Sequence, residues 1–427
     1  MQKRAVKRRT SRTVATSPDG HAASAQSSEP AFTFGIEEEY FVIDRASRDL
    51  ARDLPHPVFD ALRAAIGKGF SVEYMRSQIE IATPVLSSAE EAERILVGYR
   101  RTIADILRPN GLAPLAVATH PFADWREQKH TDKPRYNQIA DTLQGLGRRM
   151  LVNGLHVHVG IDDENDRIRV MNGLRGCLPI ILALSASSPF WQAEPTGLKS
   201  YRIAINDATP RRGIPERFDD WQAYQAEIAT MVRAGMIADA THLWWDIRPS
   251  ARFATVEVRI ADVCPRVVDS VAIAVLIRCL ARAIWRKADG LEAIAGQSLA
   301  LINENRWLAQ RYGTTNGFID PASGRVQSFR DVLEALFALL RDDADALDAH
   351  AELDHLRDVA ASGSSADRQL TIYDSAVAAG HSTAKALRTV VDHLLEETLA
   401  PVRSEHLDQL TGTSSWTGFP EAEFPRT

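Results

Sequence analysis

Residues 35–43 read Gly-Ile-Glu-Glu-Glu-Tyr-Phe-Val-Ile, a run of β-branched and aromatic residues around three glutamates. Such a run predicts a strand, in which successive side chains point to opposite faces. Glu37 and Glu39 then share one face, while Glu38 lies on the other face with Ile36 and Tyr40. Two carboxylates on one face repel each other unless a proton or a cation lies between them. Mg²⁺, which takes oxygen ligands, is one explanation of this pattern, and a solvated strand face is the other.

Three further stretches repeat this design, with one apolar face and one face of charged or polar side chains. The polar faces carry Glu80 in residues 78–82, His156 and His158 in residues 155–161, and Glu257 and Arg259 in residues 253–262. A sheet with helices on one face and a ligand on the other has this pattern. The two histidines also suit zinc, but no third soft ligand stands near them, and an exposed strand face remains an alternative.

The composition restricts the classes of protein. An apolar content of 45% and a charged content of 25% are typical of a soluble globular protein. A net charge of −6 argues against a general nucleic-acid binder. The three cysteines are widely spaced, which fits a reducing cytoplasm and offers neither a disulfide framework nor a zinc site. The longest apolar runs, such as residues 177–184 and 271–277, are too short to span a bilayer, so we expect no membrane partner.

The chain is expected to form one large domain between two tails. Residues 1–30 are basic and rich in Ser, Thr and Ala, which predicts a disordered tail, with an organellar transit peptide as the alternative. No clear linker divides residues 31–405, and residues 406–427 form a C-terminal tail. The sheet should come mainly from the N-terminal two-thirds of the domain, and helices should close its C-terminal third.

Hydrophobic periodicity and capping signals predict the remaining elements. Helices are expected over residues 57–66, 88–107, 136–150, 163–187, 221–234, 267–285, 328–347 and 365–399, and a short strand over residues 112–119. Ser88, with Glu91 three residues later, is a capping-box start, and Pro179 should kink or divide its helix. Residues 201–215 read as a loop-rich region, which inside a compact domain is typical of a functional lid.

No nucleotide-binding fingerprint occurs, because neither G-x-x-x-x-G-K-[ST] nor G-x-G-x-x-G is present. A phosphate site would therefore use Mg²⁺ on carboxylates together with arginine side chains. That combination suits ATP-driven chemistry on a carboxylate. The metals screen the triphosphate, and the arginines stabilise charge on the phosphoryl group during its transfer.

Several short motifs together also resemble a known family. They lie at residues 35–39, 77–80, 154–160, 244–249, 255–259 and 304–307. In these motifs the chain is similar to the glutamate–cysteine ligase type 2 family, and more narrowly to its bacterial carboxylate–amine ligase branch, over residues 32–400. The resemblance implies an α+β, glutamine-synthetase-like fold, with a curved, mainly antiparallel sheet and helices packed on one face. It also implies that ATP and Mg²⁺ bind on the concave face.

The resemblance further implies a reaction. ATP phosphorylates a small-molecule carboxylate to an acyl phosphate, an amine attacks, and an amide and phosphate leave. Glutamate, through its γ-carboxylate, is the first candidate for the acid and cysteine for the amine. The loop at residues 201–215 matches the family less closely than the motifs around it. Because this loop should shape the substrate pocket, the resemblance defines the reaction type better than the substrate.

The family's site residues carry over position by position. Metal-binding carboxylates are implied at Glu37, Glu39, Glu73, Glu80 and Glu257. His156 should lie beside the metals and the nucleotide phosphates, whereas other branches carry a different polar residue at the position of His158. Arg259 matches the arginine that stabilises the transferring phosphoryl group, with Arg202 as its partner.

Other functions remain open from the residues alone. With water or a guanidino group as acceptor, the same fold would be an ATPase or a guanidino kinase. A nucleotide- or metal-binding protein without ligase activity is a third alternative, and a zinc hydrolase using His156 and His158 is a fourth. A homodimer is a further alternative, although no stretch identifies an interface.

Overall fold

A computed structural model describes residues 29–321 and 323–400. Most of the predicted N-terminal tail and all of the predicted C-terminal tail lie outside these ranges. The predicted division into tails and one domain therefore stays a prediction.

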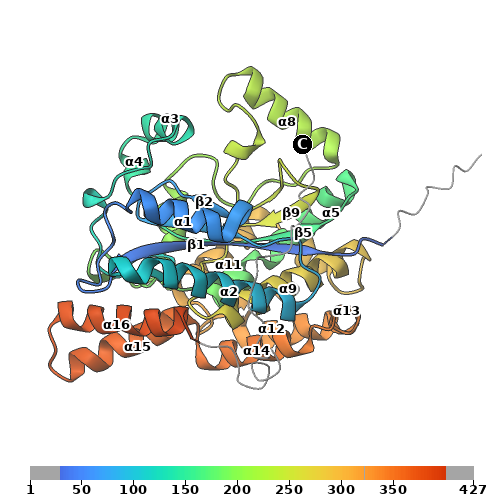
Figure 1. The fold of residues 1–427 in the computed structure, drawn as a ribbon. Helices are drawn as coiled ribbons and strands as arrows, with labels where there is room; N and C mark the ends of the chain where they lie inside the picture. Colours follow the sequence, from blue (N-terminus) through green and yellow to red (C-terminus); the bar gives the residue numbers. More distant parts are fainter. Residues whose placement is uncertain (1–28, 322, 401–427) are drawn as a thin grey trace, which may run out of the picture.

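Within the described ranges, a seven-stranded open sheet forms the centre of the fold (Figure 1). Its strands run in the order β2-β3-β1-β5-β9-β8, and β4 pairs with the C-terminal part of β1. The strands are β1 Phe34–Asp44, β2 Phe70–Val72, β3 Gln78–Ala82, β4 Leu112–Leu115, β5 Leu155–Gly160, β8 Ile247–Pro249 and β9 Thr255–Val258. All these pairings are antiparallel, which confirms the predicted sheet type. Two small hairpins pair β6 Phe190–Trp191 with β7 Glu194–Pro195, and β10 Gly317–Ile319 with β11 Val326–Ser328.

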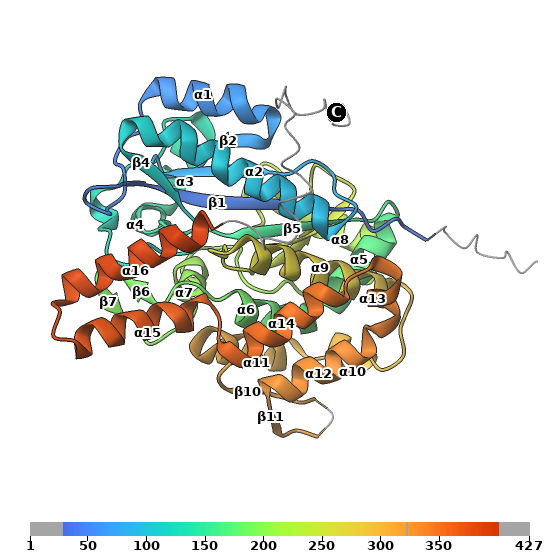
Figure 2. The same cartoon turned by 60° about the horizontal axis from the view of Figure 1, so that its bottom comes forward.

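Helices cover one face of the sheet and flank the other. The first eight are α1 His56–Ile66, α2 Ala89–Leu107, α3 Pro134–Leu143, α4 Gly145–Arg148, α5 Glu164–Leu174, α6 Leu178–Ser185, α7 Tyr201–Asp207 and α8 Trp221–Arg233. The others are α9 Val267–Trp285, α10 Glu292–Ala295, α11 Leu299–Tyr312, α12 Phe329–Leu339, α13 Arg341–Leu347, α14 His350–Ser362, α15 Ser365–Ala378 and α16 Thr383–Thr398. In Figure 1, α2 and α9 lie under the sheet, while α3 and α8 stand above it on opposite sides. Figure 2 brings forward α14, α15 and α16 of the C-terminal third.

The core lies between the apolar face of the sheet and these helices. Ile36, Val157 and Val258, from three neighbouring strands, are fully or almost fully buried there. Nearly every residue of α9 is buried, as its apolar composition predicts. Burial of each such aliphatic side chain contributes about 1.5–3 kcal/mol. On the opposite face, the N-terminal half of β1 carries polar side chains, whereas Phe41 and Ile43 farther along the strand are buried in a second apolar cluster.

Glu38 is a structural residue inside the core. It is fully buried on the apolar face of β1, where its carboxylate forms a two-point ion pair with Arg100 of α2 at 2.7 and 3.1 Å. The hydroxyl groups of Tyr40 and Ser270 donate to the same carboxylate. Arg100 also donates to the carbonyl of Cys264, so the pair joins β1 and α2 to the segment before α9.

The structure corrects the predicted loop over residues 201–215 at its beginning. Residues Tyr201–Asp207 form helix α7, and Arg202 and Ile203 on it are buried. The helix was missed because it is only seven residues long and has no side-chain N-cap. Tertiary packing of Ile203 and Ile205 stabilises it rather than a local sequence signal.

Several predicted elements are shorter or divided. The helix over residues 136–150 is broken at Gln144, whose φ of 49° lies in the left-handed region. The strand over residues 112–119 ends at Leu115, because the next amides donate to side chains of other segments instead of to a neighbouring strand. The strand over residues 253–262 is limited to β9. The helices over 328–347 and 365–399 each divide in two. The predicted division near Pro179 is confirmed, since the 3₁₀ turn Arg175–Cys177 separates α5 from α6.

One helical segment has the length and apolar character of a membrane span. Residues Glu164–Ser185, covering α5 and α6, meet both criteria, although polar residues interrupt the apolar run. Uninterrupted apolar runs alone therefore do not reveal this segment. In the fold, 94% of its most apolar window is buried, as in the core helix of a soluble protein.

Candidate active site

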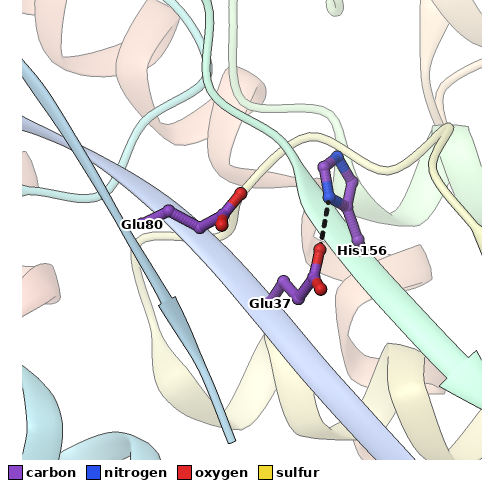
Figure 3. Close-up of side chains that lie close together, drawn as sticks. All are labelled: Glu37, Glu80 and His156. Atoms are coloured by element: carbon purple, nitrogen blue, oxygen red, sulfur yellow. Dashed lines mark hydrogen bonds and ion pairs between the residues drawn. The ribbon is translucent and has the colours of Figure 1, made fainter. Parts of the chain in front are cut away.

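The polar face of the sheet gathers side chains from four neighbouring strands. In the observed register Glu39 of β1 lies opposite Glu80 of β3, and Glu37 lies opposite His156 of β5. Directly opposite residues in an antiparallel pair project from the same face, so these side chains converge. Figure 3 shows Glu37, Glu80 and His156 on this face, with a hydrogen bond between Glu37 and His156.

All the metal-binding residues implied by the resemblance come together here. They form three overlapping groups whose ligand atoms lie within 4.8 Å of one another: Glu37, Glu80 and His156; Glu37, His158 and Glu257; and Glu39, Glu73 and Glu80. Glu73 follows β2 in the turn to β3, and its main-chain neighbour Tyr74 donates an amide hydrogen bond to its carboxylate. The predicted convergence of these residues is therefore observed, with His158 included.

A cavity of about 450 Å³ lies over these groups. Its acidic floor comes mainly from the strands, and Tyr136 of α3, Arg248 and residues 250–253 contribute to its walls. Arg202, Arg212 and Arg259 also line it, so one cavity offers both clustered carboxylates and guanidinium groups. Such a site suits a ligand that combines phosphates, divalent cations and a carboxylate.

Glu73 and Glu80 lie in the part of the acidic floor where neighbouring carboxylates repel one another. Burial raises the pKa of Glu80 well above its ordinary value, and the carboxylates of Glu37, Glu73 and Glu39 raise it further. Burial and the Glu39 carboxylate raise the pKa of Glu73 to about 7. Oxygen ligands that repel one another in this way fit hard divalent cations.

The two histidines differ in their contacts. His156 Nδ1 lies 3.1 Å from Glu37 Oε2, and its Nε2 lies 3.8 Å from Glu39 Oε1. Burial and the charge of Arg259 lower the pKa of His156. His158 lies farther along β5, with Nδ1 at 2.9 Å from the Thr255 hydroxyl and Nε2 at 3.4 Å from Glu37 Oε1.

Glu257 lies between two arginines. Arg248 Nε and Nη2 are 2.8 and 3.2 Å from its carboxylate oxygens, and Arg259 Nη1 donates to the same carboxylate. Burial opposes ionisation of Glu257, but the charges of Arg259 and Arg248 outweigh burial and hold its pKa far below the ordinary value. Sequence reasoning did not assign Arg248 to the site, although it had noted the motif Trp244–Pro249 that contains it.

Arg202 lines the cavity beside Arg259, and its contact with Arg259 is to the main chain. Its side chain is buried, and its two terminal nitrogens donate to the carbonyls of Arg259 and Ile260, each at 3.0 Å. A Cβ at Gly154 would approach the Arg202 Nη2 atom to 2.4 Å, so a glycine is needed at this point. Arg202 therefore contacts the main chain of Arg259, and these hydrogen bonds use both of its terminal nitrogens.

The motifs at residues 244–249 and 304–307 contact each other through an ion pair behind the cavity. Arg306 of α11 binds Asp246 at 2.8 Å and forms a two-point ion pair with Asp207 at 2.7 Å. Asn305 exchanges two hydrogen bonds with the main chain of Ile319. The motif at residues 304–307 is thus structural, since it joins α11 to α7 and to the segment before β8.

The family match and the curated relatives give the class that this fold and cavity serve: the chain is an ATP-dependent carboxylate–amine ligase. Residues 33–393 match the model of the glutamate–cysteine ligase family 2 (GCS2), and the chain belongs to that family. A relative from Rhodospirillum rubrum named "Putative glutamate--cysteine ligase 2" is 45% identical over 381 residues, which cover 88% of this chain and 98% of the relative.

Solved structures confirm the fold. The glutamate–cysteine ligase of Francisella tularensis, in complex with AMP, superposes with a TM-score of 0.61 at 13% identity. The superposed region covers 88% of this chain and 91% of the ligase chain. A bifunctional glutathione synthetase from Pasteurella multocida superposes with a TM-score of 0.62 at 17% identity. The superposed region covers 86% of this chain and 53% of the synthetase chain. At these identities the likeness shows the fold alone.

Proposed function

We propose that the chain joins the γ-carboxylate of glutamate to a small amine, with cysteine as the first candidate, and uses ATP and Mg²⁺. The convergence of seven carboxylate and imidazole side chains on one face of the sheet carries this proposal. The name of the Rhodospirillum rubrum relative, a glutamate–cysteine ligase, supports the choice of glutamate and cysteine.

Five glutamates and His156 would hold the divalent cations. The ligands are Glu37, Glu39, Glu73, Glu80, His156 and Glu257, and His158 adjoins them. When bound, Mg²⁺ screens the charge of the triphosphate and orients it for attack. The raised pKa values of Glu73 and Glu80 support this role, because a cation between those carboxylates would remove their mutual repulsion.

Arg259 would stabilise the transferring phosphoryl group. Its Nη1 is fixed by Glu257, and its Nε has no hydrogen-bond partner among residues 29–321 and 323–400. A substrate carboxylate oxygen attacks the γ-phosphorus of ATP, and ADP leaves. The amine nitrogen then attacks the carbonyl carbon of the acyl phosphate, and phosphate leaves as the amide forms. Arg202 would position Arg259 through its main chain instead of contacting the phosphoryl group.

The proposal includes a cytoplasmic location and small-molecule partners only. The three cysteines are free and buried, which supports a reducing compartment. We propose neither a nucleic-acid nor a membrane partner, and cell fractionation tests the location. Light scattering of the purified protein distinguishes a monomer from the homodimer that remains an alternative.

Phosphate release from ATP tests the function, measured with glutamate, Mg²⁺ and a panel of amines that includes cysteine. A single amine that raises turnover, together with a γ-amide of the expected mass, supports the proposal. Turnover without dependence on an amine would instead indicate an ATPase or a kinase. Absence of turnover with every carboxylate would favour a binding protein.

Glu257→Gln provides the site control for that assay. It removes the anion held between Arg248 and Arg259, so turnover should fall by about a hundredfold or more. Glu304→Gln, an exposed glutamate on α11 outside the cavity, should retain wild-type turnover. Unchanged turnover in Glu257→Gln would contradict the assignment of the site.

A further inference from the structure

Six arginines line the cavity, of which Arg135 and Arg252 are exposed. The inner basic wall consists of the other four: Arg202, Arg212, Arg248 and Arg259. Three of them have partners for their terminal nitrogens. Arg202 donates to two carbonyls, and Arg248 and Arg259 both bind Glu257. Arg212 has no carboxylate or carbonyl partner within the described parts of the chain.

Arg212 is nevertheless held in place. Its Nε lies 3.2 Å from the Thr209 hydroxyl, and its guanidinium carbon lies 5.5 Å from the centre of the Trp244 ring. These contacts leave Nη1 and Nη2 without a hydrogen-bond partner in the described structure. A planar guanidinium with two free terminal nitrogens presents the geometry that binds a carboxylate at two points.

The loop that carries Arg212 is hydrogen-bonded to the main chain of residues 244–246. The Arg211 carbonyl accepts a hydrogen bond from the Trp244 amide at 3.0 Å, and the Gly213 carbonyl accepts one from the Asp246 amide at 2.9 Å. Arg211 itself has a φ of 60°, in the left-handed region that a non-glycine residue seldom adopts. Such strain is maintained only where surrounding contacts fix the backbone, and it is frequent at ligand-binding sites.

Nearby acids do not neutralise Arg212. Asp246 already binds Arg306, and the Glu39 carboxylate accepts from the Gly154 amide at 2.6 Å. Burial lowers the pKa of Arg212 to about 9, with a further contribution from the charges of Arg259 and Arg202. A bound anion would remove this unfavourable excess of positive charge.

We propose that Arg212 binds a second carboxylate of the acid substrate, remote from the carboxylate that is phosphorylated, so that the enzyme selects dicarboxylic acids. This inference rests on the proposed ligase function and deepens it. The phosphates belong beside the clustered glutamates and Arg259, and Arg212 contacts none of those glutamates. The second carboxylate would sit on Arg212, with the Trp244 ring as its rigid support.

Three variants test the assignment: Arg212→Gln, Arg212→Lys, and Arg211→Gln as the matched control. Arg211 contacts the same Trp244 ring but does not line this cavity. In Arg212→Gln we expect the KM for glutamate to rise by about tenfold to a hundredfold, as for loss of a charge-assisted pair, while the KM for ATP changes less than about twofold. Arg212→Lys should be intermediate, and Arg211→Gln should resemble the wild type.

A comparison of acids provides a second measurement. The wild type should prefer glutarate over pentanoate, which has the same number of carbon atoms but only one carboxylate, and Arg212→Gln should lose this preference. A raised KM for ATP with an unchanged KM for glutamate would assign Arg212 to the nucleotide phosphates and overturn the proposal. Unchanged KM values for both ATP and glutamate would also overturn the proposal.

Binding separates this inference from the proposed function. Calorimetric titration of glutamate, in the presence of Mg²⁺ and a non-hydrolysable ATP analogue, requires no turnover. Glutamate binding that is lost in Arg212→Gln supports the carboxylate subsite even if no amine yields a product. Retained binding of the ATP analogue shows that the variant is folded, and glutamate binding equal to that of the wild type would contradict the subsite.

Discussion

Glu37 and His156 face each other across β1 and β5, and 3.1 Å separates Glu37 Oε2 from His156 Nδ1. Burial disfavours ionisation of Glu37, but hydrogen bonds from His156 and His158 outweigh burial and hold its pKa well below the ordinary value. The ionised carboxylate accepts a hydrogen bond from His156 Nδ1–H, and in that tautomer Nε2 carries the free lone pair. A histidine fixed in this way is oriented to bind a cation.

Removal of divalent cations should abolish ATP turnover, and Mg²⁺ should restore it. In Glu37→Gln, the Mg²⁺ concentration for half-maximal turnover should rise by at least about tenfold, because one ligand and the partner of His156 are both lost. Electron paramagnetic resonance of bound Mn²⁺ provides a readout without turnover. Glu90→Gln, an exposed glutamate on α2, is the control. Restoration by Zn²⁺ but not by Mg²⁺ would instead favour the zinc hydrolase.

Arg202 should act through Arg259. Arg202→Met removes the donors to the Arg259 and Ile260 carbonyls, so kcat should fall by about tenfold to a hundredfold as the Arg259 side chain loses its position. In an Arg259→Ala background, the same substitution should have little further effect on kcat. Arg202→Lys should recover part of the loss. Additive effects of the two substitutions would show that Arg202 contacts the substrate directly.

The buried pair of Glu38 and Arg100 should be important for stability. Arg100→Met leaves the Glu38 carboxylate uncompensated in the core, and the free energy of unfolding should fall by about 3–5 kcal/mol. The exposed pair of Arg108 and Asp105 provides a comparison, since Arg108→Met should cost less than about 1 kcal/mol. Denaturant titration of both variants measures the difference. Equal destabilisation by the two substitutions would contradict the structural role of Glu38.

Acid should destabilise the fold partly through His120. Burial lowers the pKa of His120 to about 4. Its Nε2 donates to the Arg48 carbonyl, and its Nδ1 accepts from the amides of Phe122 and Ala123. Between the ordinary pKa of 6.5 and the folded-state pKa of about 4, His120 is protonated in the unfolded state but neutral in the folded state. The stabilisation by neutral His120 is therefore fully present above pH 6.5 and is lost as the pH falls from 6.5 to 4.

Integrated over that range, the loss is about 3 kcal/mol. His120→Gln cannot titrate, so the difference in unfolding free energy between the wild type and this variant should shrink from pH 7 to pH 4.5. His381→Gln, on an exposed turn, is the control. A difference that is constant with pH would show that His120 is not the group responsible.

Local sequence patterns predicted the side chains of the site better than they predicted the loops. Alternation along β1 separated Glu38 from Glu37 and Glu39, and burial of Glu38 confirms that separation. The same reasoning correctly placed His156 and Glu257 on the polar face, because the period of a strand is two residues whatever its partners are. The apolar composition of residues 267–285 likewise predicted a helix with the bounds observed for α9.

Tertiary structure decided which of these faces meet. That Glu39 lies opposite Glu80, and Glu37 opposite His156, depends on pairing between strands far apart in the chain, and no local pattern encodes this register. Arg212 lies in an irregular loop without periodicity, and its free guanidinium is recognised only once the partners of the other arginines are known. The sequence by itself therefore determined which side chains are available for chemistry, because side-chain direction is a local property of the backbone. Only the fold decided their distances and pairing, because those depend on long-range packing.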